Sequence, residues 1–169
     1  MATCFSHPVV PLAIACWFPS LRKRPLLIAA ALLSAAPDLD ALGFLYFDVP
    51  YESPCGHRGC SHSLVFSLAV SLALVRPLAR RTGTAALAVL AFLFAASASH
   101  GLIDMTTDGG HGIALFWPFT DERYFLPWRP IAVAPLASPR SSRRGAPRCC
   151  GRSSAGCGYR RSRSVAPGC

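Results

Sequence analysis

Charged side chains are scarce in this sequence of 169 residues. Asp, Glu, Lys and Arg together make up 15% of it, whereas they make up about 25% of an ordinary soluble domain. Apolar residues account for 52%, and the mean hydropathy is +0.38. This scarcity of charge argues against a soluble enzyme and against a disordered or fibrous chain, and it favours a membrane protein.

Acidic residues are absent from the last 39 positions. Residues 131–169 carry eight arginines and no carboxylate, whereas residues 1–130 carry nine basic and eight acidic side chains. The formal net charge of +9 therefore belongs almost entirely to the tail, and the body is close to neutral. We expect no nucleic-acid partner for a body of this charge.

The tail also lacks the residues that build a core. From about Ser138 it contains no Leu, Ile, Phe or Trp, so it cannot bury enough apolar surface to offset the entropy of ordering. We interpret residues 136–169 as a basic disordered tail that follows a helical membrane domain at 1–135. Three origins of the tail stay open: an arm for anionic lipid or nucleic acid, a solvated tail without a role, and a frameshifted reading of GC-rich DNA.

Several enzyme motifs are missing as well. There is no Walker-type phosphate loop, no GxGxxG and no GxSxG, although a Ser-His-Asp triad stays open. Cys55 and Cys60 could pair outside the cytoplasm, but their spacing alone does not establish a disulfide. Together with His57 and His62 they would crowd four zinc ligands into eight residues, and a closed zinc site normally joins two separated pairs.

Four apolar segments divide the body, at residues 8–21, 25–37, 63–75 and 82–99. None alternates with a period of two, and Ala and Leu dominate the last three, so all four predict helices. The last segment, extended through Ile103, is long enough to cross a bilayer, which takes about 20 residues. The predicted fold class is all-α: an integral membrane bundle of about four apolar helices with a polar site at one end.

Basic residues cluster in two of the links between these segments. Residues 22–24 (RKR) join the first two segments, and Arg76, Arg80 and Arg81 join the last two. Positive loops stay in the cytoplasm, so the N-terminus, the middle loop and the end of the fourth segment are predicted to lie on the opposite face. Six aromatic residues at 116–128 suit a membrane interface or a packed loop over the bundle end.

Every histidine, and most of the aspartates, lie near segment ends on this predicted extracytoplasmic face. In chain order these residues are His7, Asp38, Asp40, His57, His62, His100, Asp104, Asp108 and His111. Four separate passages of the chain thus bring imidazoles and carboxylates to one end of one bundle. Such groups are the usual ligands of a catalytic zinc or similar divalent ion, and carboxylates at a membrane are costly without such a purpose.

A series of motifs covers about residues 5–135: SHPVVPLAI, PDLD, GHRGCSHS, SHGLID with TDGG, and FWPFTDERYFLPWRPI. In this order they resemble the YdjM-like family of bacterial inner-membrane proteins, often described as membrane-bound metal-dependent hydrolases. That family looks distantly similar to the zinc-dependent phospholipase C and P1 nuclease group, which is all-helical and binds a zinc cluster. The last HxxxE pair of that group has no counterpart here, so the resemblance implies one or two zinc ions rather than three.

On this basis we assign five ligands of a divalent metal ion and three residues with catalytic roles. The predicted ligands are His7, Asp38, His62, His100 and Asp104, the last two sharing a helix face at a spacing of four. The predicted catalytic residues are Asp40 and His57, as an orienting partner, a base or an additional ligand, and Arg58, as a bidentate clamp on a phosphate oxygen. The roles of Asp108 and His111 stay open.

These expectations describe a multi-pass protein of the bacterial inner membrane with its site on the extracytoplasmic side. We predict a metal-dependent hydrolase that acts on a phosphoester, as a lipid or small envelope substrate, through a metal-activated water. Its expected partners are the lipid bilayer and that substrate. The alternative is a non-catalytic integral membrane protein that binds metal or uses the His/Asp cluster structurally. A transporter is disfavoured because no charged residue lies inside an apolar segment.

Overall fold

The structure, a computed structural model, describes residues 6–50, 53–54 and 56–132 of the chain. Within these ranges the secondary structure is helical and no strand forms, which confirms the predicted all-α class. The predicted tail at 136–169 lies outside the described residues.

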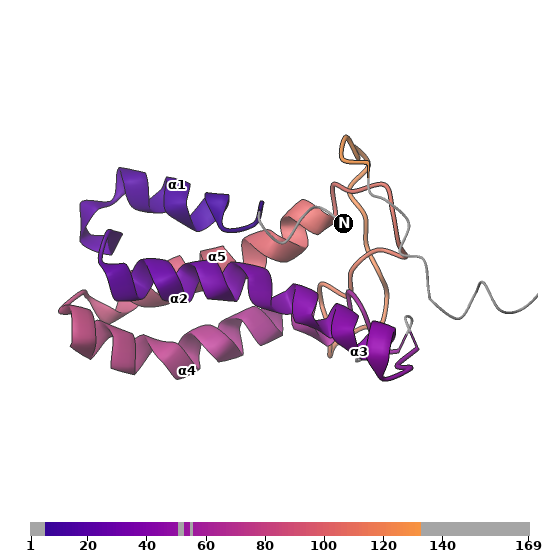
Figure 1. Ribbon diagram of the computed structural model, residues 1–169, viewed down its shortest axis with the longest axis horizontal. Coiled ribbons are helices and arrows are strands. Elements are labelled where there is room, and N and C mark those ends of the chain that lie inside the picture. Colours follow the sequence, from indigo (N-terminus) through magenta and orange to yellow (C-terminus); the bar gives the residue numbers. More distant parts are fainter. Residues whose placement is uncertain (1–5, 51–52, 55, 133–169) are drawn as a thin grey trace, which may run out of the picture. The chain divides into compact units, whose positions relative to one another are not determined.

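Five α-helices and three short 3₁₀ helices make up the described part of the chain. In order they are α1 (Val9–Trp17), η1 (Pro19–Leu21), α2 (Arg24–Ala35), η2 (Ala36–Leu39), α3 (Asp40–Tyr46), η3 (Cys60–His62), α4 (Leu64–Thr82) and α5 (Ala86–Asp104). The four predicted apolar segments correspond to α1, α2, α4 and α5. These four helices pack alongside one another, with α3 and the loops that follow α5 at one end (Figure 1).

The helix α4 is longer than the apolar segment that predicts it. The apolar run ends at Arg76, but the helix continues to Thr82, because a charged side chain ends a hydrophobic run without breaking helical backbone. The stop signal is Gly83, which has a φ of 61° and donates its N–H to the carbonyl of Ala79 at 2.8 Å. This left-handed glycine is a common helix C-terminal cap.

The apolar core lies chiefly between α2 and α5. Leu26 and Ala30 of α2 are fully buried, as are Val89, Leu93 and Ala96 of α5. The alanines let the two helix backbones approach closely, which is typical of helices packed within a membrane. Apolar side chains are also exposed on the outer faces of the bundle, among them Leu12, Ile28, Leu32, Leu72 and Leu87. Helices that are apolar on both their inner and outer faces suit a lipid surrounding.

Among the described residues, two stretches are long and apolar enough to cross a membrane, Arg24–Gly43 and Ala86–Asp104. The second is α5, whose 19 residues extend about 28 Å at 1.5 Å per residue, close to the roughly 30 Å of a bilayer's hydrocarbon core. The first runs from α2 through η2 into α3. Pro37 does not interrupt this helical path, because it stands in the first turn of η2, where a missing N–H donor costs little.

The two basic links lie next to each other at one end of the bundle. Lys23 donates a hydrogen bond from Nζ to the carbonyl of Thr82, and Thr84 donates from its hydroxyl to the carbonyl of Ser20 at 3.4 Å. The opposite end of the bundle is formed where α2 leads into α3, where η3 leads into α4, and where α5 ends. The predicted site residues belong to that opposite end.

Candidate metal centre

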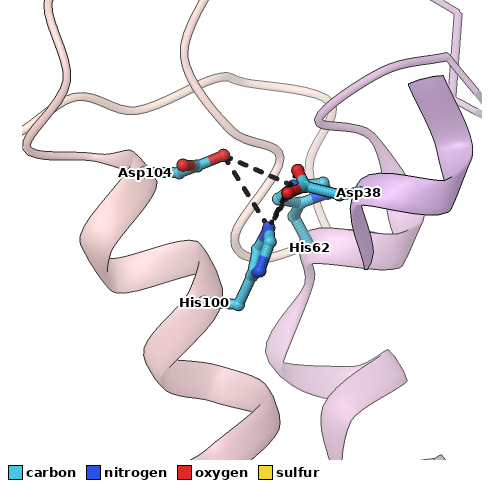
Figure 2. Close-up of side chains that lie close together, drawn as sticks. All are labelled: Asp38, His62, His100 and Asp104. Carbon is cyan, nitrogen blue, oxygen red and sulfur yellow. Dashed lines mark hydrogen bonds and ion pairs between the residues drawn. The ribbon is translucent and has the colours of Figure 1, made fainter. Parts of the chain in front are cut away.

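Four of the five predicted ligands converge at this end of the bundle. One ligand atom from each of Asp38, His62, His100 and Asp104 lies within 4.8 Å of the others, and Figure 2 shows the four side chains turned toward one another. They are supplied by η2, by η3 and by the last turns of α5. All four residues are buried, with exposed fractions from 0 to 9%. The fold therefore brings together distant parts of the chain to make one compact polar group.

The backbone fixes the orientation of His100. Its Nδ1 lies 2.7 Å from the carbonyl oxygen of Ser34. Because a carbonyl only accepts, Nδ1 carries the hydrogen and Nε2 keeps a lone pair. That Nε2 lies 3.1 Å from Nε2 of His62 and 3.4 Å from Oδ1 of Asp38. His100 thus presents a ligand atom to the other three residues.

His62 is oriented in the same sense. Its Nδ1 lies 3.2 Å from Oδ2 of Asp40 and 3.0 Å from the hydroxyl of Ser61. Ser61 donates its own hydrogen to Oδ2 of Asp40 at 2.5 Å, so Nδ1 is the donor to both neighbours and Nε2 faces the group. Burial opposes a charged ring, but hydrogen bonds to Asp104 and Asp40 outweigh it and raise the pKa of His62. Its surroundings therefore favour a positive charge at this position.

The four residues bring two imidazole nitrogens and two carboxylates close together in a buried space. Two imidazole nitrogens face each other at 3.1 Å, and Asp104 Oδ2 lies 3.5 Å from the nearer of them. Such a buried arrangement is repulsive unless a proton or a metal cation lies within it. Imidazole nitrogens and carboxylate oxygens are the usual ligands of zinc and similar divalent ions. The residues present therefore fit a divalent metal ion.

His7 lies beside this group rather than within it. Its ring stacks on that of His100, with centroids 3.9 Å apart. The side chain is fully buried, and neither ring nitrogen has a hydrogen-bond partner. Burial, and then the neighbouring His100, lower the pKa of His7, which favours a neutral ring. Two buried nitrogens without partners are costly, and a metal ion would relieve that cost. The assignment of His7 as a ligand stays a prediction.

Asp40 connects two chain segments around the group. Its Oδ1 accepts from Nδ1 of His57 at 2.5 Å, and its Oδ2 accepts from the backbone N–H of Arg58 at 3.1 Å. Since Oδ2 also contacts His62 and Ser61, one carboxylate positions both histidines of the GHRGCSHS motif. A carboxylate in this position commonly orients a metal-binding histidine. The catalytic roles of Asp40 and His57 stay predictions.

Arg58 joins the same motif to the end of α5. Its Nε lies 3.3 Å from Oδ2 of Asp104, Nη1 donates to the carbonyl of Gly109 at 2.6 Å, and Nη2 donates to the hydroxyl of Thr107 at 3.0 Å. The guanidinium is buried, and each of its nitrogens faces a protein atom. A guanidinium has five N–H groups, so these contacts leave N–H groups of Arg58 for a further partner, and its predicted role as a clamp on a phosphate oxygen stays a prediction.

Comparison with known proteins identifies the family. The profile of the family described as "YdjM inner membrane protein" matches residues 1–154. The chain belongs to the YdjM family. It is 41% identical over 141 residues to inner membrane protein YbcI of Escherichia coli (strain K12), an alignment that covers 83% of this chain and 81% of that protein. No solved structure matches the chain. The predicted family and the predicted inner-membrane location are thus confirmed.

Three contributions to the site of this YdjM-family protein carry little or no signal in the sequence. They are the carbonyl of Ser34, the hydroxyl of Thr107 and the side chain of Arg123. Arg123 donates to the carbonyls of His57 at 3.2 Å and Ser53 at 3.3 Å, so it supports the GHRGCSHS loop from outside. A contact to a backbone carbonyl leaves no residue pattern, whereas Ser61 could have been found because it lies inside that motif.

The two residues whose roles the sequence leaves open lie outside the four-residue group. Asp108 and His111 follow α5, and both are exposed. The backbone N–H of Asp108 donates to the carbonyl of Ile131 at 3.0 Å. This contact holds the loop after α5 against the last described part of the chain.

Proposed function

We propose that this YdjM-family protein is a membrane-bound, metal-dependent hydrolase that cleaves a phosphoester. The observation that carries the proposal is the buried group in which ligand atoms of two histidines and two carboxylates lie within 4.8 Å of one another. Asp38, His62, His100 and Asp104 would hold the ion, with His7 as an additional ligand, and zinc is the ion we propose. A bound divalent ion acidifies water and neutralises charge on a phosphoester.

The surrounding residues would prepare the site for this chemistry. Asp40 and the carbonyl of Ser34 hold the Nδ1 atoms of His62 and His100, so that both Nε2 atoms point toward the ion. His57 shares a hydrogen bond with Asp40 through Nδ1, which makes Nε2 its basic nitrogen. A histidine paired with a carboxylate in this way is suited to accept a proton as a general base.

We further propose a multi-pass topology with the site on the extracytoplasmic side. Its support is the adjacency of the two basic links, through Lys23 and Thr82, at the end away from the His/Asp group, since basic links favour the cytoplasm. Aromatic side chains are exposed near both ends of the bundle, Trp17 at 84% on one and Phe47 at 77% and Trp128 at 74% on the other. Such aromatic residues anchor proteins at the two interfaces of a bilayer.

The expected substrate is a phosphoester of a lipid or of a small envelope molecule. His100 and Asp104 lie in the last turns of α5, which is a membrane-length helix. If α5 spans the bilayer, the ion lies near the level of the lipid headgroups rather than far out in the aqueous phase. A lipid phosphoester would reach that level without leaving the membrane.

Metal content and a phosphoester panel on the purified, full-length protein test the proposal. The protein in detergent is stripped with a chelator, reloaded with zinc, and assayed with p-nitrophenyl phosphate, bis(p-nitrophenyl) phosphate and phosphatidic acid in vesicles. We expect hydrolysis of at least one substrate, loss of metal and activity in the double variant His100→Ala/Asp104→Ala, and retention of both in Asp121→Asn, which alters an exposed carboxylate outside the group. A wild-type protein that binds no divalent ion would overturn the metal centre.

The second candidate function is metal binding without turnover. The burial of the group, with every ligand residue 9% exposed or less, favours it, because a substrate must reach the ion before it can be cleaved. Stoichiometric metal together with no hydrolysis across the panel would establish this second function and exclude the first.

A further inference from the structure

The buried surroundings of the candidate centre carry a definite formal charge. Three carboxylates, Asp38, Asp40 and Asp104, have side chains that are 7%, 10% and 4% exposed. One guanidinium, that of Arg58, is 5% exposed and lies against Asp104. With the ligand histidines neutral, as metal binding requires, and His57 neutral as the proposed general base, three negative charges and one positive charge leave a net charge of −2. One divalent cation supplies the missing charge.

We propose that Arg58 is the fixed cation of a site that holds one metal ion and excludes a second. Buried charge is strongly unfavourable unless it is neutralised. One divalent ion brings this group to neutrality, whereas a second would leave an excess of two positive charges in the same buried space. The inference rests on the metal-binding part of the proposed function and is independent of hydrolysis.

The position of Arg58 supports the same conclusion. Ions in two-metal sites lie about 3.5–4 Å apart, and a second ion bound through Asp104 would compete with a guanidinium only 3.3 Å away. The guanidinium cannot easily withdraw, because the carbonyl of Gly109 and the hydroxyl of Thr107 hold its other two nitrogens. It therefore keeps a positive charge beside Asp104.

The backbone conformation of Arg58 also supports the proposal. Its φ is 64°, a left-handed conformation that is uncommon for residues other than glycine. Backbone strain of this kind persists where the surrounding structure demands it, and it gathers at functional sites. Here the strained backbone brings the N–H of Arg58 to Asp40 while its side chain reaches Asp104, so that one residue serves two of the three carboxylates.

Zinc titration of the chelator-stripped, full-length protein, with metal content measured by mass spectrometry, tests the proposal. We expect one equivalent of zinc in the wild type and one in Arg58→Lys, which keeps the charge. In Arg58→Gln, which removes it, we expect either a second equivalent or an affinity for the first ion at least about tenfold higher. Arg129→Gln is the matched control, because Arg129 is exposed and lies over the ring of Phe125 rather than in the His/Asp group, and it should keep one equivalent at wild-type affinity.

Two equivalents in the wild type would overturn the inference while leaving the proposed metal centre intact. No metal in the wild type would instead overturn the proposed function itself. Weaker binding by Arg58→Gln, in a variant that melts cooperatively, would also overturn the inference, because Arg58 would then act by positioning Asp104. If Arg58→Gln does not fold, Arg58→Met, which also removes the charge, takes its place in the titration.

Discussion

A single carboxylate, that of Asp40, fixes two histidines that lie 17 and 22 positions away along the chain. Its Oδ1 contacts His57, and its Oδ2 contacts His62, Ser61 and the backbone N–H of Arg58. Each of these partners presents an N–H or O–H, so both oxygens must accept. The carboxylate is therefore matched to its surroundings, and an amide of the same shape is not.

Replacing Asp40 by Asn tests this dependence. One end of the amide would be an NH₂ group facing donors, so His62 would lose its fixed orientation. We expect the affinity for zinc to fall by about 10- to 100-fold, the usual cost of losing a carboxylate that orients a metal-binding histidine. Competition with a chromophoric chelator measures the affinity, and Asp121→Asn serves as the control. Unchanged affinity in Asp40→Asn would show that His62 does not depend on Asp40.

The same substitution can be compared at His7 and at His111, because the two histidines differ in burial. His7 is buried against His100 with neither nitrogen paired, whereas His111 is exposed. We expect His7→Phe, which keeps an aromatic ring on His100 but removes both nitrogens, to lower the affinity for zinc by about tenfold or more. His111→Phe should leave it unchanged. Equal affinities in the two variants would assign His7 a packing role only.

At the level of elements, the site depends on how closely α5 approaches η3. A Cβ atom placed on Gly101 of α5 would lie 2.9 Å from the carbonyl oxygen of His62 and 3.1 Å from Cδ1 of Ile113. These distances are shorter than ordinary contacts, and the first involves backbone that cannot rotate away. Glycine at this position therefore allows His62 to reach the ligands on α5.

The variant Gly101→Ala separates helix stability from this close approach. Alanine is the better helix former by about 1 kcal/mol, yet we expect weaker zinc binding because η3 and His62 must move outward. Gly43→Ala in α3 is the matched control, since its Cβ would lie 3.6 Å from Cγ2 of Val49, an ordinary contact. It should keep wild-type affinity and an equal or higher Tm. Wild-type zinc affinity in Gly101→Ala would mean that η3 adjusts without disturbing His62.

The sequence predicts the elements well because their signals are local. Apolar runs without alternation predict α1, α2, α4 and α5, and the positions of histidines at segment ends predict where the polar group gathers. The predictions from sequence separate Asp38, as a ligand, from Asp40, as an orienting partner, a base or an additional ligand, but PDLD by itself does not explain the separation. Asp38 lies in η2 and joins the ligand group, whereas Asp40 begins α3 and turns to His57. The different directions of the two carboxylates depend on the tight 3₁₀ turn between them, which no local sequence pattern predicts.

At the scale of the whole molecule, the basic links and the buried His/Asp group occupy opposite ends of the bundle. The basic links meet at the end where Lys23 contacts Thr82, and the buried His/Asp group occupies the other. Between the two ends, α5 and the stretch Arg24–Gly43 are each of membrane length. A bundle built this way has one orientation in the inner membrane that keeps its basic links in the cytoplasm.

Reporter fusions to the intact N-terminal portion test that orientation. A phosphatase that is active only in the periplasm should be active when fused after residue 60 or after residue 110, and inactive after residue 83. The reason is that residues 60 and 110 lie at the end of the His/Asp group, whereas residue 83 lies between the basic link and α5. A fluorescent protein that matures only in the cytoplasm should give the reverse pattern at the same three positions, which controls for expression.

Phosphatase activity at residue 83 with silence at the other two would invert the molecule and place the metal centre in the cytoplasm. Activity at residue 60 but not at 110 would mean that α4 and α5 do not cross the membrane as a pair, and the bundle could then no longer bring His62 and His100 to the same side.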